Sequence, residues 1–142
     1  MPTYRTTTVW RGGHLGEVVC SNGARMAFSA PAALYGHPDV LTPEDAFVGA
    51  LNMCFQLMFL WSTEKLKLDL VSYECEAEGF VEELLDRRSI FKKIVLRPKV
   101  EARNCGEDLI WRALRLAEKY SLVAQSIRAE VVVEPEIRVV ET

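Results

Sequence analysis

The first forty residues alternate short apolar stretches with turn residues, a pattern typical of β-strands. Thr6–Trp10 is rich in β-forming residues and is followed by a Gly-Gly break. Two further apolar runs flank Asn22-Gly23, a dipeptide that favours a tight hairpin turn. We therefore expect an N-terminal β-meander, followed by an irregular loop over residues 30–40, which contain two prolines and a glycine.

A long helix is predicted next. Thr42 can cap its first turn and Pro43 suits its first helical position. The pattern continues to about Lys67, roughly 25 residues or ~37 Å of helix. Between Ala46 and Trp61 the residues are apolar nearly all round, which is typical of a helix that is buried on most faces. One small domain is not expected to cover such a helix on every side, so the pattern indicates burial against a partner.

The second half of the chain predicts two strands, a helix and a last strand. Apolar and polar residues alternate over 68–80 and again over 89–101, as in half-buried strands joined by a hairpin. A helix with one apolar face is expected from Leu109 to about Tyr120. The segment 129–140 reads as one strand, in which Pro135 marks a bulge or an edge.

This order of elements predicts a single α+β domain over residues 1–142. The chain has 17 Lys and Arg against 20 Asp and Glu, a net charge of −3, which gives no basic surface for nucleic acid or anionic lipid. The apolar run Ala46–Trp61 is shorter than the ~20 residues of a membrane span. The first residues carry no signal-peptide pattern. We therefore expect a cytoplasmic protein that has no membrane or nucleic-acid partner.

Common cofactor and metal motifs are absent from the sequence. It has no glycine-rich phosphate loop and no Cys-x-x-Cys pair, and His14 and His37 are its only histidines. We expect no cofactor and no metal. Four free thiols are expected in a reducing compartment: Cys20, Cys54, Cys75 and Cys105.

Cys54 is the thiol with the most suggestive surroundings. It lies in the middle of the long predicted helix, between the polar residues Asn52 and Gln56. Its spacing alone also fits a small buried hydrophobe. Cys75 shares the apolar face of its strand, and Cys105, in a turn, is expected to be exposed. A reactive role is thus a hypothesis for Cys54, and packing is the expected role of Cys75.

The start of the long helix resembles a motif of a known family. Residues 41–55 read LTPEDAFVGALNMCF and are similar to the (N/S)PE-x-(L/F)-x-A-x-x-x-x-C segment of the OsmC/Ohr family, the osmotically induced and organic hydroperoxide resistance proteins. The order of elements agrees along most of the chain. Residues 120–126, YSLVAQS, correspond to the family's C-(P/L)-(V/I)-S segment after the second helix.

The resemblance implies an OsmC-like fold and an intertwined homodimer, with the two central helices packed together and two sites at the interface. In the peroxidase members, the central-helix cysteine attacks a hydroperoxide and becomes a sulfenic acid. A second cysteine then closes a disulfide, while an arginine and a glutamate hold the thiolate and the oxygen. The implied dimer agrees with the helix pattern that indicates burial against a partner.

The family's roles can be carried over residue by residue. Cys54 corresponds to the peroxidatic cysteine and Glu44 to the acid of the Pro-Glu pair, whereas the resolving cysteine falls on Ser121, which cannot form a disulfide. Glu44 and Cys54 are ten residues apart, or ~15 Å along a straight helix. Either the chain near Glu44 leaves the helix axis, or Glu44 serves the Cys54 of the partner subunit.

The site cation also departs from the family pattern. The family's Gly-Gly-Arg falls on Gly12-Gly13-His14, so a histidine stands where a guanidinium is expected. Histidine is only partly charged near neutral pH and cannot form the bidentate fork of arginine. Arg5 and Arg11 are alternative sources of the cation.

Two functions follow from the resemblance. The first is a thiol-dependent, peroxidase-type enzyme that reduces organic hydroperoxides or other small electrophiles through Cys54, with an external thiol as reductant. The second is a non-catalytic homodimer that binds a small apolar ligand. Aromatic and thioether side chains that could line such a pocket, or simply form the dimer core, are Phe47, Met53, Phe55, Met58, Phe59 and Trp61.

Overall fold

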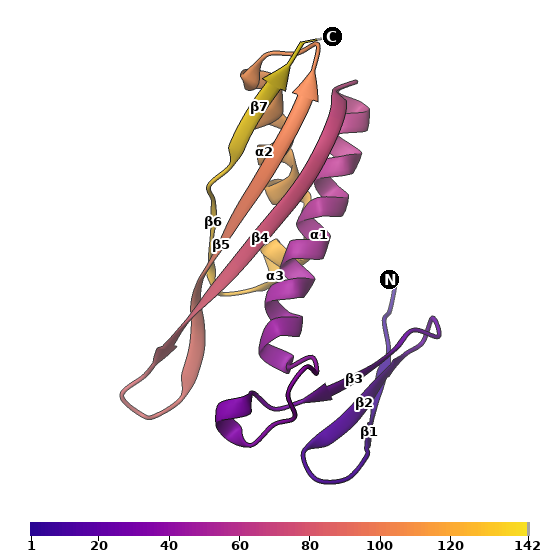
Figure 1. Ribbon diagram of the computed structural model, residues 1–142, viewed down its shortest axis with the longest axis vertical. Helices are drawn as coiled ribbons and strands as arrows, with labels where there is room; N and C mark the ends of the chain where they lie inside the picture. The colour runs from indigo at the N-terminus through magenta and orange to yellow at the C-terminus, as the bar shows by residue number, and fades with distance from the viewer. Residues whose placement is uncertain (142) are drawn as a thin grey trace. The chain divides into compact units, whose positions relative to one another are not determined.

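The computed structural model describes residues 1–141 and has an α+β fold. It contains two compact units, one formed by Met1–Phe47 and the other by the rest of the chain. The single domain expected over residues 1–142 stays a prediction. Figure 1 shows the elements of both units.

The first unit is built on a three-stranded antiparallel sheet in the order β1-β2-β3, which confirms the predicted β-meander. The Asn22-Gly23 turn closes the second hairpin: the Ala24 amide donates to Asn22 Oδ1 at 3.0 Å, and Gly23 has a φ of 97°. The strands and the short 3-10 helix that follows are β1 (Thr6–Trp10), β2 (Leu15–Cys20), β3 (Arg25–Ser29) and η1 (Ala32–Leu34).

The long helix α1 (Pro43–Lys65) begins where the sequence predicts. Thr42 Oγ1 accepts a hydrogen bond from the Asp45 amide at 3.0 Å and so caps the first turn. The helix ends slightly before the predicted Lys67, which adopts a φ of 53°. As a whole, α1 is long and apolar enough to cross a membrane, which the shorter run Ala46–Trp61 did not indicate. Core helices of soluble proteins meet the same criterion.

The second unit is a sheet with helices on one face. The helices α1 and α2 both pack their apolar side chains against β5, in one continuous core (Figure 1). The long antiparallel pair β4-β5 dominates the sheet, with β4 at its edge. The elements after α1 are β4 (Asp69–Glu83), β5 (Ser89–Arg103), α2 (Glu107–Tyr120), α3 (Leu122–Ser126), β6 (Glu130–Val133) and β7 (Glu136–Val140).

The end of the chain differs from the single predicted strand over 129–140. Two strands, β6 and β7, run parallel to β5, one after the other. The Glu134 amide still donates to Leu96 O at 2.8 Å, but Pro135 has no N–H to continue the ladder. The residues after α2 also form a separate short helix, α3, which periodicity did not indicate.

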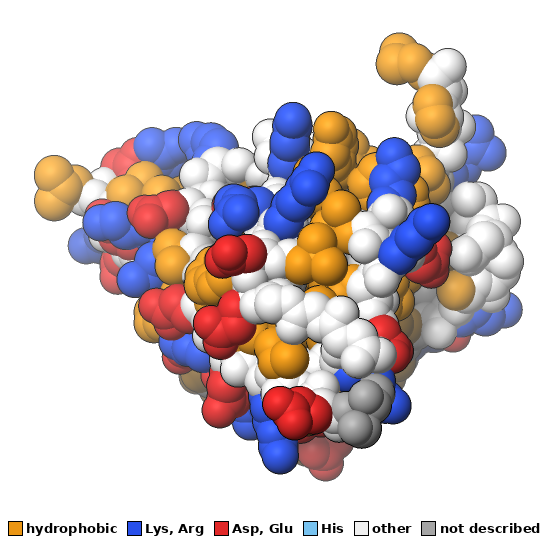
Figure 2. All heavy atoms as spheres, turned by 90° about the horizontal axis from the view of Figure 1, so that it is seen from above, with side chains coloured by type: hydrophobic (Ala, Val, Ile, Leu, Met, Phe, Trp, Pro, Cys, Tyr) orange, Lys and Arg blue, Asp and Glu red, His pale blue; other side chains and the backbone are white. Residues whose placement is uncertain are grey.

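The two faces of α1 have very different surroundings within the chain. Leu51, Phe55 and Phe59 are fully buried. On the other side, Met53 and Leu57 remain 64% and 60% exposed. Of the 18 consecutive residues that form the most apolar part of α1, only 28% are buried. On the face of the molecule that Figure 2 shows, hydrophobic side chains lie among charged ones.

Candidate functional site

The structure brings Cys54 and Ser121 into contact. The hydroxyl of Ser121 donates a hydrogen bond to Cys54 Sγ, with the oxygen and sulfur 3.1 Å apart. Ser121 is fully buried, whereas Cys54 is half-buried in the middle of α1. The Ser121 oxygen also accepts a hydrogen bond from the Ala124 amide at 3.1 Å. The Ser121 hydroxyl therefore accepts one hydrogen bond and donates another.

Local backbone structure holds Ser121 in this place. Its φ of −71° and ψ of 114° are extended, so α2 ends there and α3 begins one residue later. The side chain is the N-cap of α3, and the Ser121 carbonyl accepts from the Gln125 amide at 3.0 Å. Ser121 is therefore a hydrogen-bond donor that the local backbone holds in a fixed place.

Two aromatic rings lie beside this pair, and sequence reasoning did not bring them together. Trp61 on α1 and Tyr120 at the end of α2 are in edge-to-face contact, with ring centroids 5.8 Å apart. They are 38% and 50% exposed. Trp61 follows Cys54 by seven residues, two helical turns, and Tyr120 directly precedes Ser121. Their contact follows from the packing of α1 against the end of α2, which the spacing in sequence does not reveal.

The polar neighbours of Cys54 in sequence have different roles. The amide of Asn52 donates to the carbonyl of Cys75 at 3.1 Å and ties α1 to β4. Gln56 is exposed. Asn52 is therefore a structural link between helix and sheet.

His14 and Glu44 belong to the first unit. His14 Nδ1 lies 3.1 Å from the carbonyl oxygen of Tyr35, which can only accept, so Nδ1 carries the proton. Glu44 is exposed in the first turn of α1, so the chain does not leave the helix at this residue. Their assignment to the Cys54 site stays a prediction.

The two alternative arginines have different surroundings. Arg11 pairs with Glu17 at 2.9 Å, and Glu17 also binds Arg25 at 2.8 Å. Hydrogen bonds from Arg25 and Arg11 lower the pKa of Glu17. Arg5 is exposed and has no ion pair within the described residues. Arg11 therefore shares one carboxylate with Arg25, whereas Arg5 has no such partner within the described residues.

Cys75 and Cys105 both pack against the core of the second unit. Cys75 lies against the core as expected, and burial raises the pKa of its thiol. Cys105 was expected to be exposed but is half-buried against the same core, and burial raises the pKa of its thiol as well. A raised pKa leaves less thiolate at neutral pH, so both thiols are weaker nucleophiles than an ordinary exposed cysteine.

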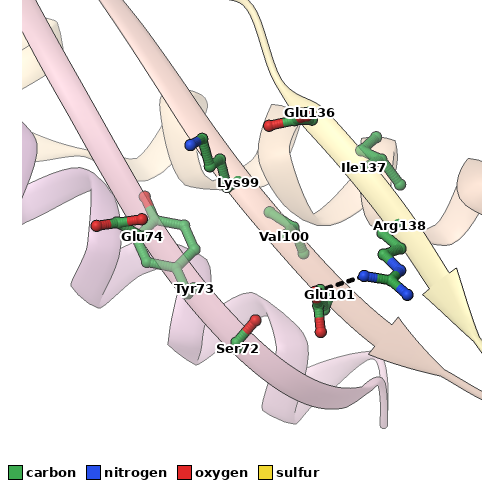
Figure 3. A pocket seen from close by; sticks show the side chains of 9 residues that line it. All are labelled: Ser72, Tyr73, Glu74, Lys99, Val100, Glu101, Glu136, Ile137 and Arg138. Atoms are coloured by element: carbon green, nitrogen blue, oxygen red, sulfur yellow. Dashed lines mark ion pairs between the residues drawn. The ribbon is translucent and has the colours of Figure 1, made fainter.

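Within residues 1–141, no group of three His, Cys, Asp or Glu side chains could hold a metal ion. A hollow of about 540 Å³ in the second unit lies over β4, β5 and β7 and is lined by neither Cys54 nor Ser121. Figure 3 shows its charged side chains, among them the pair of Arg138 and Glu101, 3.5 Å apart. The hollow is therefore separate from the thiol.

Known structures share this fold. An OsmC-like protein of unknown function from Vibrio cholerae matches with a TM-score of 0.87 and 23% identity, over 95% of this chain and 99% of that one. An organic hydroperoxide resistance protein from Elizabethkingia anophelis matches with a TM-score of 0.76 and 16% identity, over 97% and 96%. The organic hydroperoxide resistance protein OhrB of Bacillus subtilis matches with a TM-score of 0.65 and 18% identity, over 96% and 98%.

The search of curated protein sequences gave no match. The family model described as OsmC-like protein matches residues 36–136, which include α1 with Cys54 and the segment with Ser121. The match covers well over half of the chain and agrees with the fold of the solved structures. The protein therefore belongs to the OsmC-like family.

Proposed function

We propose that the protein is a thiol-dependent enzyme that reduces organic hydroperoxides through Cys54. The observation that carries the proposal is the buried hydroxyl of Ser121, which donates to Cys54 Sγ at 3.1 Å. The hydroxyl lies where it can hold the sulfur in place for attack, and a cysteine reacts as a nucleophile through its sulfur. Two structures of the same fold are of organic hydroperoxide resistance proteins, which supports the choice of substrate class.

In the first step, the Cys54 thiolate attacks the terminal oxygen of the hydroperoxide. A sulfur–oxygen bond forms and the oxygen–oxygen bond breaks, so the sulfur is oxidised to a sulfenic acid and the alkoxide that leaves takes up a proton to become an alcohol. The Ser121 hydroxyl holds the sulfur during the attack. It donates to the anion that reacts and cannot itself be oxidised by the sulfenic acid.

In the second step, an external thiol of the cytoplasm regenerates the enzyme. Its sulfur attacks the sulfenic sulfur, water leaves, and a mixed disulfide forms; a second thiol then releases Cys54 and carries away the disulfide. An external reductant is required because Ser121 occupies the position of the family's resolving cysteine. Cys75 and Cys105 have raised pKa values and pack against the core, which disfavours them as substitutes.

The working unit is proposed to be an intertwined homodimer. The exposed apolar side chains of α1, such as Leu57, need cover that this chain does not supply. From the family resemblance, Glu44 and His14 are assigned as the acid and the cation of the site. Since Glu44 lies ~15 Å along the helix from Cys54, it is assigned to Cys54 of the partner subunit.

Steady-state turnover tests this proposal. Cumene hydroperoxide should be consumed in the presence of dithiothreitol, and Cys54→Ser should lower the rate at least about 100-fold, because serine is a far weaker nucleophile at neutral pH. Cys75→Ser is the matched control and should keep most of the activity. Turnover that survives Cys54→Ser would assign the chemistry to another thiol.

A binding function is the alternative. The exposed Met53, Leu57 and Trp61 side chains also suit a small apolar ligand held between two copies of α1. In that case the protein would bind a hydrophobic dye in competition with apolar ligands, but would not consume a hydroperoxide with any thiol reductant.

A further inference from the structure

Two lysines are held over the aromatic pair beside the thiol. Lys65 Nζ lies 4.6 Å from the ring centroid of Trp61, and Lys119 Nζ lies 5.3 Å from that of Tyr120. Neither ammonium has an ion pair within residues 1–141. Each lysine follows a glutamate in the sequence, but consecutive helix residues do not face each other. Each ring of the pair is therefore faced by a positive charge that has no bound carboxylate among the described residues.

The distance from these charges to the thiol is set by the helix. Cys54, Leu57 and Trp61 share one face of α1, and seven residues correspond to ~10 Å of helix. Because Lys65 Nζ folds back over Trp61, its charge lies at the level of that ring. Tyr120, at the end of α2, lies next to this face, because its ring contacts Trp61 and the residue after it, Ser121, contacts Cys54. We call the strip formed by Trp61 and Tyr120 the aromatic seam.

We infer that Lys65 and Lys119 determine specificity at the Cys54 site, by favouring reactants that carry an anionic group ~10 Å from the atom that meets the sulfur. The inference rests on the proposed function of Cys54. An apolar body covers the aromatic seam, the carboxylate faces the two ammoniums, and the reactive end reaches the thiol. A neutral reactant of the same shape gains only the apolar contact.

A matched pair of thiol reagents separates charge from shape. Maleimidohexanoate carries a carboxylate ~10 Å from its reactive double bond, and its methyl ester differs only in charge. In each reaction the thiolate adds to one alkene carbon and the other carbon takes a proton. We expect the anion to modify Cys54 about three- to tenfold faster than the ester, from two exposed charge pairs. Higher ionic strength should lower this ratio.

Charge-matched variants identify the groups responsible. The double variant Lys65→Gln/Lys119→Gln should bring the ratio of the two rates at Cys54 to about one. The control Lys92→Gln/Lys93→Gln removes the same charge, and Lys93 also lies over a ring, with Nζ 5.1 Å from the Phe80 centroid. It should leave the ratio unchanged. Mass spectrometry that assigns adducts by site makes the other three cysteines internal references.

The outcomes are distinct. Equal rates for the anion and the ester in the wild type, with Cys54 reactive, would overturn the inference and leave the proposed function standing. A ratio that falls equally in both double variants would assign the effect to net charge and would also overturn it. If Cys54 resists both reagents, the seam is closed to such reactants; the inference then fails, and hydroperoxide turnover decides the proposed function separately.

Discussion

The two faces of α1 are alike in sequence and opposite in use. One face places Leu51, Phe55 and Phe59 in the core, where none of them is exposed. The other leaves Met53 and Leu57 mostly exposed, and Cys54 lies half-buried between the two faces. Apolar character alone therefore does not show whether a helix face packs in the core of its own chain or binds another molecule. The experiments below separate these two uses.

The buried face should dominate the stability of the chain. Phe59 is fully buried and stacks on Tyr73, with ring centroids 5.1 Å apart. Phe59→Ala should lower the free energy of unfolding by about 3–5 kcal/mol, from lost burial and the cavity that remains. Denaturant titration measures the change, and Leu85→Ala, at the exposed hairpin tip, is a control that should shift it by less than about 0.5 kcal/mol.

The exposed face should dominate assembly. Leu57→Asp places a charge where the proposed dimer buries an apolar side chain, and should weaken association at least about 100-fold, or ~2.7 kcal/mol. Sedimentation velocity at micromolar concentration would show a dimer become a monomer, with unchanged circular dichroism. A wild-type protein that is already monomeric under these conditions would show that this face has another occupant.

The contact between Cys54 on α1 and Ser121 can be tested by oxidation. On peroxide treatment the wild type should form a sulfenic or overoxidised Cys54, without a disulfide to Cys54 within one chain. Ser121→Cys should instead form that disulfide and protect Cys54 from overoxidation, since oxygen and sulfur lie 3.1 Å apart in the wild type. Non-reducing peptide mapping detects the link, and its absence in a correctly folded variant would contradict the assignment of Ser121.

The Ser121→Ala variant is the companion to this test. It removes the N-cap of α3 together with the hydrogen bond to sulfur, and should cost about 1 kcal/mol of stability. It should form no disulfide to Cys54, which separates the effect of a new thiol from the effect of losing the hydroxyl.

The smallest expected effect is a loss of stability at alkaline pH, caused by Cys75 on β4. Burial raises the pKa of the Cys75 thiol above its unfolded value of about 8.5. The unfolded chain therefore loses this proton at lower pH, so the stability from the neutral thiol is complete below about pH 8.5 and is lost as pH rises through the folded pKa. Urea titrations from pH 7 to 10 should show this decline, and Cys75→Ala should reduce it.

Local signals predicted the fold well, because they depend on neighbouring residues. Thr42 and Pro43 fixed the start of α1, and Asn22-Gly23 fixed a hairpin. Periodicity could not choose between the faces of α1, since both are apolar. It also could not show that Pro135 separates two strands, both parallel to β5, because strand partners are set by tertiary packing.

The candidate site was less accessible to sequence reasoning. Cys54 and Ser121 were singled out through family motifs, and no spacing rule joins residues on α1 to residues after α2. The contact of Trp61 with Tyr120 depends on how those two helices pack. The lysines over these rings read in the sequence as ordinary solvated charges, since a cation–π contact leaves no periodic pattern.

The strand order of the second unit also sets an order of folding. The strands β4 and β5 are neighbours in sequence and are closed by the short loop after Glu83, so their pairing costs little chain entropy. The parallel strands β6 and β7 can join β5 only after α2 and α3 have crossed the sheet. Non-local pairing of this kind slows folding. We therefore expect the β4-β5 hairpin to be structured in the transition state, with β7 added on the native side of the barrier.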